Sequence, residues 1–449
     1  MRGAAQGMRR PGRSGAALGW GVRIGAFLVA LAVGVVGGTW AGLWTRGAPS
    51  VSLGSVTTRN APALPATRPV AEDTILAWTP NGLPRGFAAR VSRLRGVAHA
   101  VPVVSGIAWL TETMRDLVPQ RPPQGYAYPI EVAAARLGRY APFLAPGDRL
   151  MLPEVRRGGG LLGRSSAALR GIEPGETAAM WFRPGGVWGG SSPRAAGVGG
   201  VPASGPPNGR RIGSIVRIPV AGIVPDAAIG ANEVFVSMRT AARLGLHTER
   251  YILVDPEKGT PRGRLAERVR GLLPGDVPMR IRGPGETPYF RQGDAVLPQV
   301  RMKQLFGEFA ARPEPGGYLA IDPEWISRHI VTTRLPLLGE VRCNRTIIPQ
   351  LRGALSEIEA SGLGHLVNPR QFGGCFSPRF VNRIPNAGLS HHAWGAAVDI
   401  NVAANPYGRP PTQDHRLVAI FERWGFIWGG RFLIPDGMHF DFIRFASGS

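Results

Sequence analysis

Lysine is almost absent from the sequence, and its many arginines are not gathered into a basic stretch. Only Lys258 and Lys303 are lysines among 53 basic residues, and with 30 acidic residues the formal net charge is +23. Such a charge favours an anionic partner. The arginines are spread along the chain, however, and no compact basic stripe is interleaved with aromatic residues. We therefore expect no nucleic-acid partner.

Cysteine is equally scarce, with Cys343 and Cys375 as the only two. Both fall in the C-terminal part of the chain. Outside the cytoplasm, a lone pair within one domain is most simply a disulfide, which would stabilise that domain by about 3 to 4 kcal/mol. Two separate buried thiols are the alternative interpretation.

Long apolar runs are also rare, and residues 24–44 are the one uncharged run long enough to cross a membrane. Only Arg46 follows this run closely, whereas several arginines precede it: Arg2, Arg9, Arg10, Arg13 and Arg23. The positive-inside rule then predicts a cytoplasmic tail at 1–23, a transmembrane anchor at 24–44 and export of the remainder. A cleaved signal peptide is the alternative, although its apolar core is usually shorter. A single span disfavours a permease subunit.

The rest of the chain divides by composition. Residues 45–80 are predicted to be a linker, because they include a long stretch rich in Ser, Thr, Pro and Ala. Residues 81–334 mix β-branched stretches such as 212–224 with an amphipathic helical pattern at 261–273, which indicates a mixed α+β domain. Within it, 184–211 is crowded with Gly, Ser and Pro and is predicted to be a long insertion.

Two stretches of this middle region carry a resemblance. "LLGRSSAALRGIEPGETAAM" and the later "VAGIVPDAAIGANEVFVSMRTAARLGL" resemble the extracytoplasmic core domain of MacB-type and FtsX-type permeases. The resemblance includes no catalytic motif, and the permease helices are missing. It implies a module for interaction or positioning, with a protein partner.

The last predicted domain, 335–449, begins with a helical pattern at 347–363 and continues in short strands. In "AAVDINV" the period of two places Val398 and Ile400 on one face and Asp399 on the other. In "MHFDF" the same period makes His439 and Asp441 project together. Two half-buried strands therefore each present a side chain that can bind a metal.

His392, together with His439 and Asp399 from these strands, gives a set of two histidines and one carboxylate. This is a common ligand set for catalytic zinc. Zinc lowers the pKa of a bound water toward about 7 and so supplies a nucleophile at neutral pH. Asp436, on a turn set by Pro435 and Gly437, is well placed to take a proton from that water and return it to the leaving amine.

The same residues carry a second resemblance. Ser-x-His-x-x-Gly-x-Ala-x-Asp, followed by Asp-x-x-His-Phe, resembles the pattern of VanY-like D-alanyl-D-alanine carboxypeptidases and L-alanyl-D-glutamate peptidases. The matching positions are Ser390, His392, Gly395, Ala397, Asp399, Asp436 and His439. The resemblance implies that Zn²⁺ is bound by His392, Asp399 and His439, with Asp436 as the base. It also implies an upstream arginine that stabilises the oxyanion; Arg379 fits that position, with Arg370 and Arg383 close by.

At two positions the assignment of residues from the pattern is not unique or departs from the family. His391 competes with His392, and neighbours in an extended segment point apart, so we expect only one of them to bind the ion; the family spacing selects His392. The family often has Glu or Gln soon after its last His-Phe pair, whereas this chain has Asp441, which would alter contacts around the ligands.

Together these features predict an α+β protein whose C-terminal domain is a small zinc peptidase with a central antiparallel sheet. The implied substrate is the stem peptide of peptidoglycan, cut as a carboxypeptidase or an endopeptidase. The predicted location is the cell membrane, with one N-terminal helix in the membrane and the later domains outside. The alternative is an inactive wall-binding or scaffold protein, although the presence of all three ligands and the base favours the enzyme.

Overall fold

The structure, a computed structural model, describes residues 73–115, 117–176, 178–183, 215–284, 293–385 and 387–446. The predicted anchor at 24–44 and the predicted insertion at 184–211 lie outside the described residues. Within the described ranges, no helix combines the length and the apolar character needed to cross a bilayer. All the described residues belong to one compact unit.

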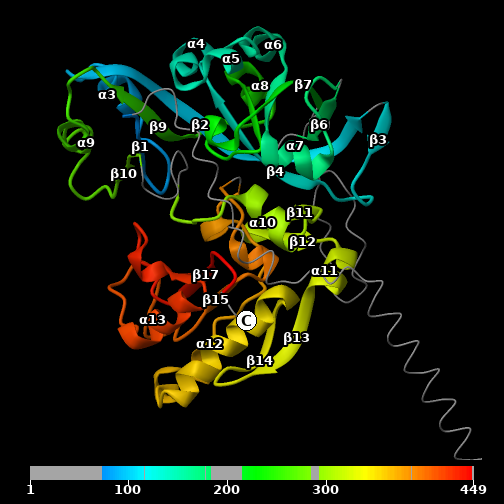
Figure 1. The fold of residues 1–449 in the computed structure, drawn as a ribbon, viewed down its shortest axis with the longest axis vertical. Coiled ribbons are helices and arrows are strands. Elements are labelled where there is room, and N and C mark those ends of the chain that lie inside the picture. Colours follow the sequence, from blue (N-terminus) through cyan, green and yellow to red (C-terminus); the bar gives the residue numbers. More distant parts are fainter. Residues whose placement is uncertain are drawn as a thin grey trace, which may run out of the picture. The chain divides into compact units, whose positions relative to one another are not determined.

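A large mixed sheet organises the first part of this unit (Figure 1). Its strands follow the order β10-β1-β9-β2-β4-β8-β5-β7-β6, and β3 pairs with β2. The β4–β8 and β5–β7 pairs are parallel, and the other pairs are antiparallel. The strands are β1 Ile75–Trp78, β2 Val97–Arg115, β3 Val118–Gln120, β4 Tyr128–Ala135, β5 Gly160–Gly163, β6 Ala179–Arg183, β7 Val216–Val224, β8 Val234–Ser237, β9 Glu249–Pro256 and β10 Arg280–Arg282.

Helices cover both faces of this sheet because its strands are apolar on both sides. In β4, Ala133 and Ala135 contact one buried cluster, whereas Val132 and Ala134 contact another. The first cluster includes side chains from α4 Leu137–Tyr140 and α6 Leu152–Arg157, near the short α5 Pro146–Arg149. The second cluster includes side chains from α7 Arg164–Arg170 and α8 Met238–Arg243. At the β1–β9 end of the sheet, α3 Phe87–Val91 and α9 Arg262–Arg270 share a further cluster.

In the described residues, the second part of the unit contains three smaller sheets and four α-helices. Its antiparallel three-stranded sheet has the order β15-β17-β16. The elements are α10 Gln299–Phe306, β11 Ala311–Glu314, β12 Tyr318–Ile321, α11 Pro323–His329, β13 Ile330–Leu335, β14 Gly339–Asn344, α12 Ile348–Ala360, β15 Ala397–Asp399, α13 His415–Arg423, β16 Phe426–Trp428 and β17 His439–Phe442. The predicted α+β class and the predicted antiparallel C-terminal sheet are therefore confirmed.

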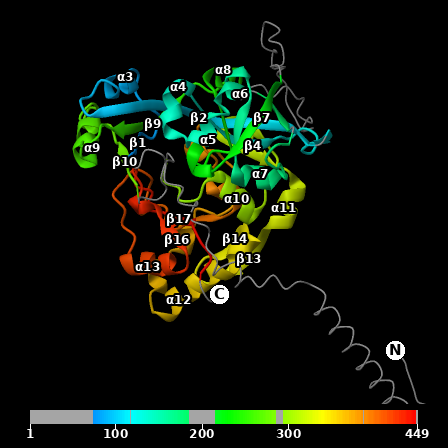
Figure 2. The same cartoon turned by 45° about the horizontal axis from the view of Figure 1, so that its top comes forward.

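Helices α12 and α13 lie side by side in both views (Figures 1 and 2). The predicted apolar stripe of α12 is buried, including Leu351, Leu355 and Ile358. Helix α13 is capped by Asp414, whose carboxylate accepts a hydrogen bond from the Arg416 N–H at 2.8 Å and so satisfies one free donor of the first turn. These helices support the short strands that carry the predicted site.

One hydrophobic core joins the C-terminal region to the large sheet. Ile107 and Trp109 of β2 belong to the same buried cluster as Phe306, Phe309 and the C-terminal core residues. The ring of Trp109 meets the ring of Phe380 edge to face, with centroids 6.4 Å apart. The C-terminal core therefore extends into the segment before residue 335. Similarly, β1 lies within the predicted linker at 45–80 and pairs with β9. The domain boundaries stay predictions.

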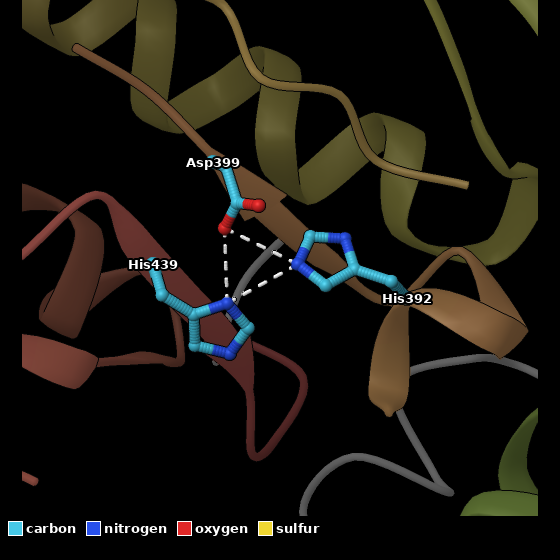
Figure 3. A group of neighbouring side chains, drawn as sticks. All are labelled: His392, Asp399 and His439. Atoms are coloured by element: carbon cyan, nitrogen blue, oxygen red, sulfur yellow. Dashed lines mark hydrogen bonds and ion pairs between the residues drawn. The ribbon is translucent and has the colours of Figure 1, made fainter. Parts of the chain in front are cut away.

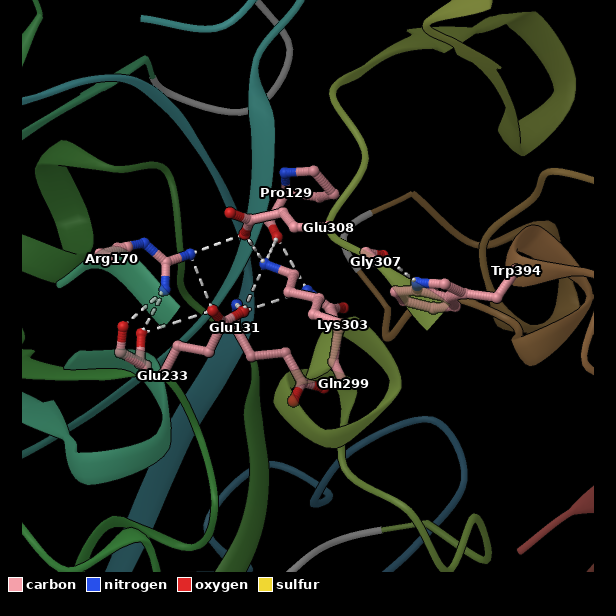
Figure 4. Close-up of polar contacts among 10 residues, drawn as sticks. Pro129, Glu131, Arg170, Glu233, Gln299, Lys303, Gly307, Glu308 and Trp394 are labelled. Atoms are coloured by element: carbon pink, nitrogen blue, oxygen red, sulfur yellow. Dashed lines mark hydrogen bonds and ion pairs between the residues drawn. The ribbon is translucent and has the colours of Figure 1, made fainter. Parts of the chain in front are cut away.

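Buried ion pairs reinforce this junction (Figure 4). The Lys303 ammonium of α10 lies 2.8 Å from Glu233 and 2.7 Å from Glu308. The Arg170 guanidinium contacts the same two carboxylates, at 3.0 and 2.8 Å. Glu233 and Lys303 are almost fully buried, so each charge depends on the others for compensation. The network holds α10 against α7 and β8.

Cys343 and Cys375 form a disulfide, with their Cα atoms 5.3 Å apart. The predicted pairing is thus confirmed. Cys343 lies on β14, and Cys375 lies in the loop that runs beside β15, where Gly374 and Asp399 form a bridge. The covalent link therefore fixes the loop next to the predicted metal ligands.

Candidate metal centre

His392 lies in a 3₁₀ helix, His391–Trp394, and not in the extended segment that the sequence analysis expected. The turn closes through the Ala393 N–H to Ser390 carbonyl bond at 2.8 Å and the Gly395 N–H to His392 carbonyl bond at 3.1 Å. Gly395 ends it with a φ of 65°, and a Cβ there would lie 2.8 Å from the Asn344 nitrogen. Glycine is therefore required at this position, both for its conformation and for the close approach.

Hydrogen bonding fixes the orientation of the His392 ring. Its Nδ1–H donates to the carbonyl oxygen of Cys375 at 2.8 Å. Because a carbonyl can only accept, this bond assigns the proton to Nδ1 and leaves Nε2 available as a ligand atom. The side chain is buried, and Nε2 faces Asp399 and His439.

Asp399 and His439 meet across two antiparallel strands. They are register partners of β15 and β17, so their side chains project from the same face of the small sheet. Asn401, with a φ of 54°, lies just beyond the end of β15, which stops three residues earlier than the apolar pattern suggested. The side chain of Asn401 is fixed by donating to the Leu366 carbonyl and accepting from the Asn368 N–H.

Figure 3 shows the three predicted ligands converging on one point. Asp399 Oδ1 lies 3.2 Å from His392 Nε2 and 3.0 Å from His439 Nδ1, and the two ring nitrogens are 3.2 Å apart. Zinc ligands at about 2.0 to 2.2 Å in a tetrahedron are separated by about 3.3 to 3.6 Å. The ligand atoms present therefore fit a single small cation, and all of them lie within 4.8 Å of one another.

The electrostatics of this trio also suit a cation. Burial alone would raise the pKa of the Asp399 carboxyl, but His392 and His439 outweigh that effect and hold the pKa far below its usual range. Burial would lower the pKa of His439, yet the hydrogen bond and charge of Asp399 raise it to about 9. The Asp399 carboxylate thus stays ionised and attracts positive charge, whether from protons on the imidazoles or from a metal ion.

Asp436 lies close to the same group. Its Oδ1 is buried and has no hydrogen-bond partner among the described residues. Burial raises the pKa of Asp436, while the charge of His439 opposes that effect and the charge of Asp399 adds to it. A buried carboxyl oxygen without a partner is costly. Its cost is explained if the oxygen faces a water held by the three predicted ligands, His392, Asp399 and His439, which are called the metal group below.

Among the three arginines considered for the oxyanion, Arg379 is the one placed at the site. Its Nη2 is 3.7 Å from Asp399 Oδ2. Arg383 instead contacts Tyr318, and Arg370 is exposed. The side chain of Arg379 is itself about three-quarters buried, with 25 % exposed.

His391 has a partner that its position in the sequence did not predict. Its Nδ1 lies 2.8 Å from Asp441 Oδ1, and both side chains are buried. Burial alone would raise the pKa of Asp441, but His391 outweighs it and lowers the pKa. Adjacent histidines thus serve two carboxylates, His391 serving Asp441 and His392 serving Asp399. The only sequence signal was the period of two that aligns Asp441 with His439.

The site brings two histidines and one carboxylate together beside a further carboxyl group, and the first three side chains could hold a metal ion. Residues 384–442 match the sequence model of a peptidase family described as D-alanyl-D-alanine carboxypeptidase. The C-terminal part of the chain is thus a metallopeptidase domain of that family, as the sequence pattern predicted. The match includes His392, Asp399, Asp436 and His439, and begins after Arg379.

The chain matches no curated protein. Among solved structures, it is similar to the periplasmic region of MacB from Actinobacillus actinomycetemcomitans, with 11 % identity, 49 % of this chain and 92 % of that chain covered, and a TM-score of 0.27. It is also similar to a domain of a permease protein from Porphyromonas gingivalis, with 14 % identity, 52 % and 98 % covered, and a TM-score of 0.26.

Proposed function

We propose that the protein is a membrane-anchored zinc peptidase that hydrolyses the stem peptides of peptidoglycan outside the cytoplasm. One observation carries the chemical part of this proposal: His392 Nε2, Asp399 Oδ1 and His439 Nδ1 converge within 3.2 Å of one another beside the unpartnered carboxyl oxygen of Asp436. The substrate class follows from the family that residues 384–442 match.

The three converging side chains would hold the zinc ion. Two neutral imidazoles and one carboxylate are a preferred donor set for Zn²⁺ in hydrolases. When bound, zinc polarises a substrate carbonyl and lowers the pKa of water, so that a nucleophile is available at neutral pH. The Cys375 carbonyl keeps the proton of His392 on Nδ1, so that Nε2 is available as a ligand atom.

Asp436 and Arg379 would complete the chemistry. The raised pKa of Asp436, caused by burial, brings its carboxylate closer to the proton affinity needed for a general base. Asp436 takes a proton from the attacking water and returns it to the leaving amine. Arg379, held near Asp399 Oδ2, supplies positive charge for the oxygen of the tetrahedral intermediate.

The location follows from the N-terminal sequence and from the disulfide. The arginine-rich tail before residues 24–44 favours insertion with the tail in the cytoplasm. The Cys343–Cys375 disulfide suits an oxidising compartment. Both features support a location of the peptidase domain on the side of the membrane where peptidoglycan lies.

The experiment is incubation of the full-length protein with purified muropeptides, before and after chelation and after zinc is added back. We expect cleavage that chelator abolishes and zinc restores. The masses of the products distinguish a terminal D-Ala-D-Ala bond from an internal L-Ala-D-Glu bond. A protein that binds muropeptides without cleaving them under any of these conditions would support the alternative, a wall-binding scaffold, and overturn the proposal.

A further inference from the structure

The proposed base lies on a loop whose shape determines where its carboxyl group points. This loop, residues 429–438, joins β16 to β17 and is called the base loop below. The Asp436 N–H donates to the Gly429 carbonyl at 2.9 Å, and the Asp436 carbonyl accepts from the His439 N–H at 3.1 Å. Phe432 of the same loop lies beside the ring of His439, with centroids 6.0 Å apart. A shift of the base loop would therefore move Asp436 relative to the metal group.

The middle of the base loop is attached to the large-sheet region. The N–H of Leu433 donates to Asp294 Oδ2 at 2.8 Å, and the carbonyl of Arg431 accepts from Arg280 Nη2 at 3.1 Å. The side chain of Leu433 packs against the buried cluster of the large sheet that includes Leu76 and Trp78. The loop that carries the base thus docks on residues more than a hundred positions earlier in the chain.

Asp294 is itself held in a fixed position. Its Oδ1 is paired with Arg280 Nη1 at 2.5 Å and lies 3.4 Å from Arg282 Nη2. Arg282 is buried in β10 and also donates to the Gly293 carbonyl at 2.7 Å. The Asp294 side chain is 10 % exposed, so its charge is compensated by these two guanidinium groups and not by solvent. One carboxylate oxygen therefore binds the arginines while the other holds Leu433.

We propose that Asp294 is a positioning residue for hydrolysis, which acts through Leu433 and the base loop to aim Asp436 at the metal group. The inference rests on the proposed function, because it assumes that Asp436 is the base. It means that efficient hydrolysis requires a residue of the large-sheet region, which lies outside the residues that match the peptidase family. The Asp294 side chain touches none of the three metal ligands, so its effect is on the turnover step and not on metal binding.

The test uses the full-length protein and two substitutions. In Asp294→Ala the Leu433 N–H loses its acceptor, whereas the single amide oxygen of Asp294→Asn can accept from Leu433 or from the two arginines but not from both. We expect kcat to fall about tenfold to a hundredfold in Asp294→Ala, because small misplacements of a catalytic group have effects of that size. KM and zinc content should stay within twofold of wild type, and the kcat of Asp294→Asn should lie between those of Asp294→Ala and wild type.

Hydrogen exchange supplies a measurement that does not depend on activity. On the zinc-free protein, the Leu433 amide should exchange about tenfold faster in Asp294→Ala than in wild type. Asp255→Ala is the matched control, since Asp255 pairs with His99 on the same large sheet, away from the base loop. It should change neither kcat nor the exchange of Leu433.

Two results would overturn the inference. One is a wild-type kcat in Asp294→Ala when Leu433 exchange is accelerated, which would mean that the docking does not aim the base. The other is an equal loss of kcat in the Asp255→Ala control, which would indicate a general effect on the sheet. A wild-type protein that cleaves no muropeptide would instead overturn the proposed function, and this inference with it.

Discussion

The ring of His392 donates a 2.8 Å hydrogen bond to the main-chain carbonyl of Cys375, and Cys375 is bonded covalently to Cys343. The orientation of a metal ligand is therefore tied to a disulfide. Hydrogen-bond partners of this kind change metal affinity when they are lost, because they set the tautomer and direction of the imidazole. The disulfide is thus part of the support of the metal centre as well as of the fold.

Replacing both cysteines by serine should weaken zinc binding. The double variant Cys343→Ser/Cys375→Ser frees the loop that presents the carbonyl, so we expect zinc affinity to fall about tenfold to a hundredfold. Its unfolding free energy should fall by about 3 to 4 kcal/mol for the 32-residue separation. Affinity is measured by competition with a chromophoric chelator. Leu265→Ala, on the buried face of α9, is a control that destabilises the protein remotely and should leave zinc affinity unchanged.

Asp436→Asn should separate catalysis from metal binding. The amide has the size of the carboxyl group but cannot accept a proton at neutral pH. We expect turnover of muropeptides to fall about 10²- to 10⁴-fold while one zinc ion per chain remains bound. The control is Asp414→Asn, which makes the same substitution before α13 and keeps a capping group there. This variant should retain full activity. Turnover near the wild-type level in Asp436→Asn would reject the role of the base.

The two adjacent histidines should give opposite results. His392→Ala should lose stoichiometric zinc binding, whereas His391→Ala should keep it. His391→Ala leaves the buried carboxylate of Asp441 without its partner, so its unfolding free energy should fall by about 3 to 5 kcal/mol. The double variant His391→Ala/Asp441→Ala should recover part of this loss, as measured by denaturant unfolding. Loss of zinc in His391→Ala would show that the wrong histidine has been assigned.

Glu233 should make the stability of the protein depend on pH in acid. Burial alone would raise the pKa of Glu233, but Lys303 and Arg170 outweigh it and hold the pKa below the ordinary value of 4.5. The stabilisation by this carboxylate is therefore complete above about pH 4.5 and is lost as the pH falls through the lower pKa of the folded state. Glu233→Gln should cost about 3 to 5 kcal/mol at pH 7, and the difference from wild type should shrink below pH 4.5.

The measurement for Glu233 is urea unfolding at several pH values. Glu154→Gln is the matched control, because Glu154 pairs with Arg157 at an exposed position, where ion pairs contribute little. A stability difference for Glu233→Gln that stays constant from pH 7 to pH 3 would mean that the buried network is not ionised.

Local periodicity was sufficient to predict the parts of the site that lie on strands. The period of two placed Asp399 and His439 on the polar faces of two strands, and these residues are register partners in the structure. The apolar stripe of α12 was also predicted and is buried. Such patterns are local, since they depend on residues a few positions apart.

Other features of the site depend on contacts that no local pattern contains. The extended segment predicted around His391 and His392 is wrong, because Gly395 closes a 3₁₀ turn there. The pairing of His391 with Asp441 joins residues 50 positions apart, and that of Asp294 with Leu433 joins residues 139 apart. A charged residue in a loop gives no sign in the sequence of which main-chain group it will bind.

The shared core of Trp109, Phe306, Phe309 and Phe380 has a consequence for how this chain can be divided or recombined. A fragment beginning at residue 335 would lack three of these aromatic rings and would present their apolar contact surface to water, which favours aggregation. Exchanging either part for that of a distant relative would bring together side chains of mismatched volume. Natural variants of the two parts are therefore expected to change in step at these positions.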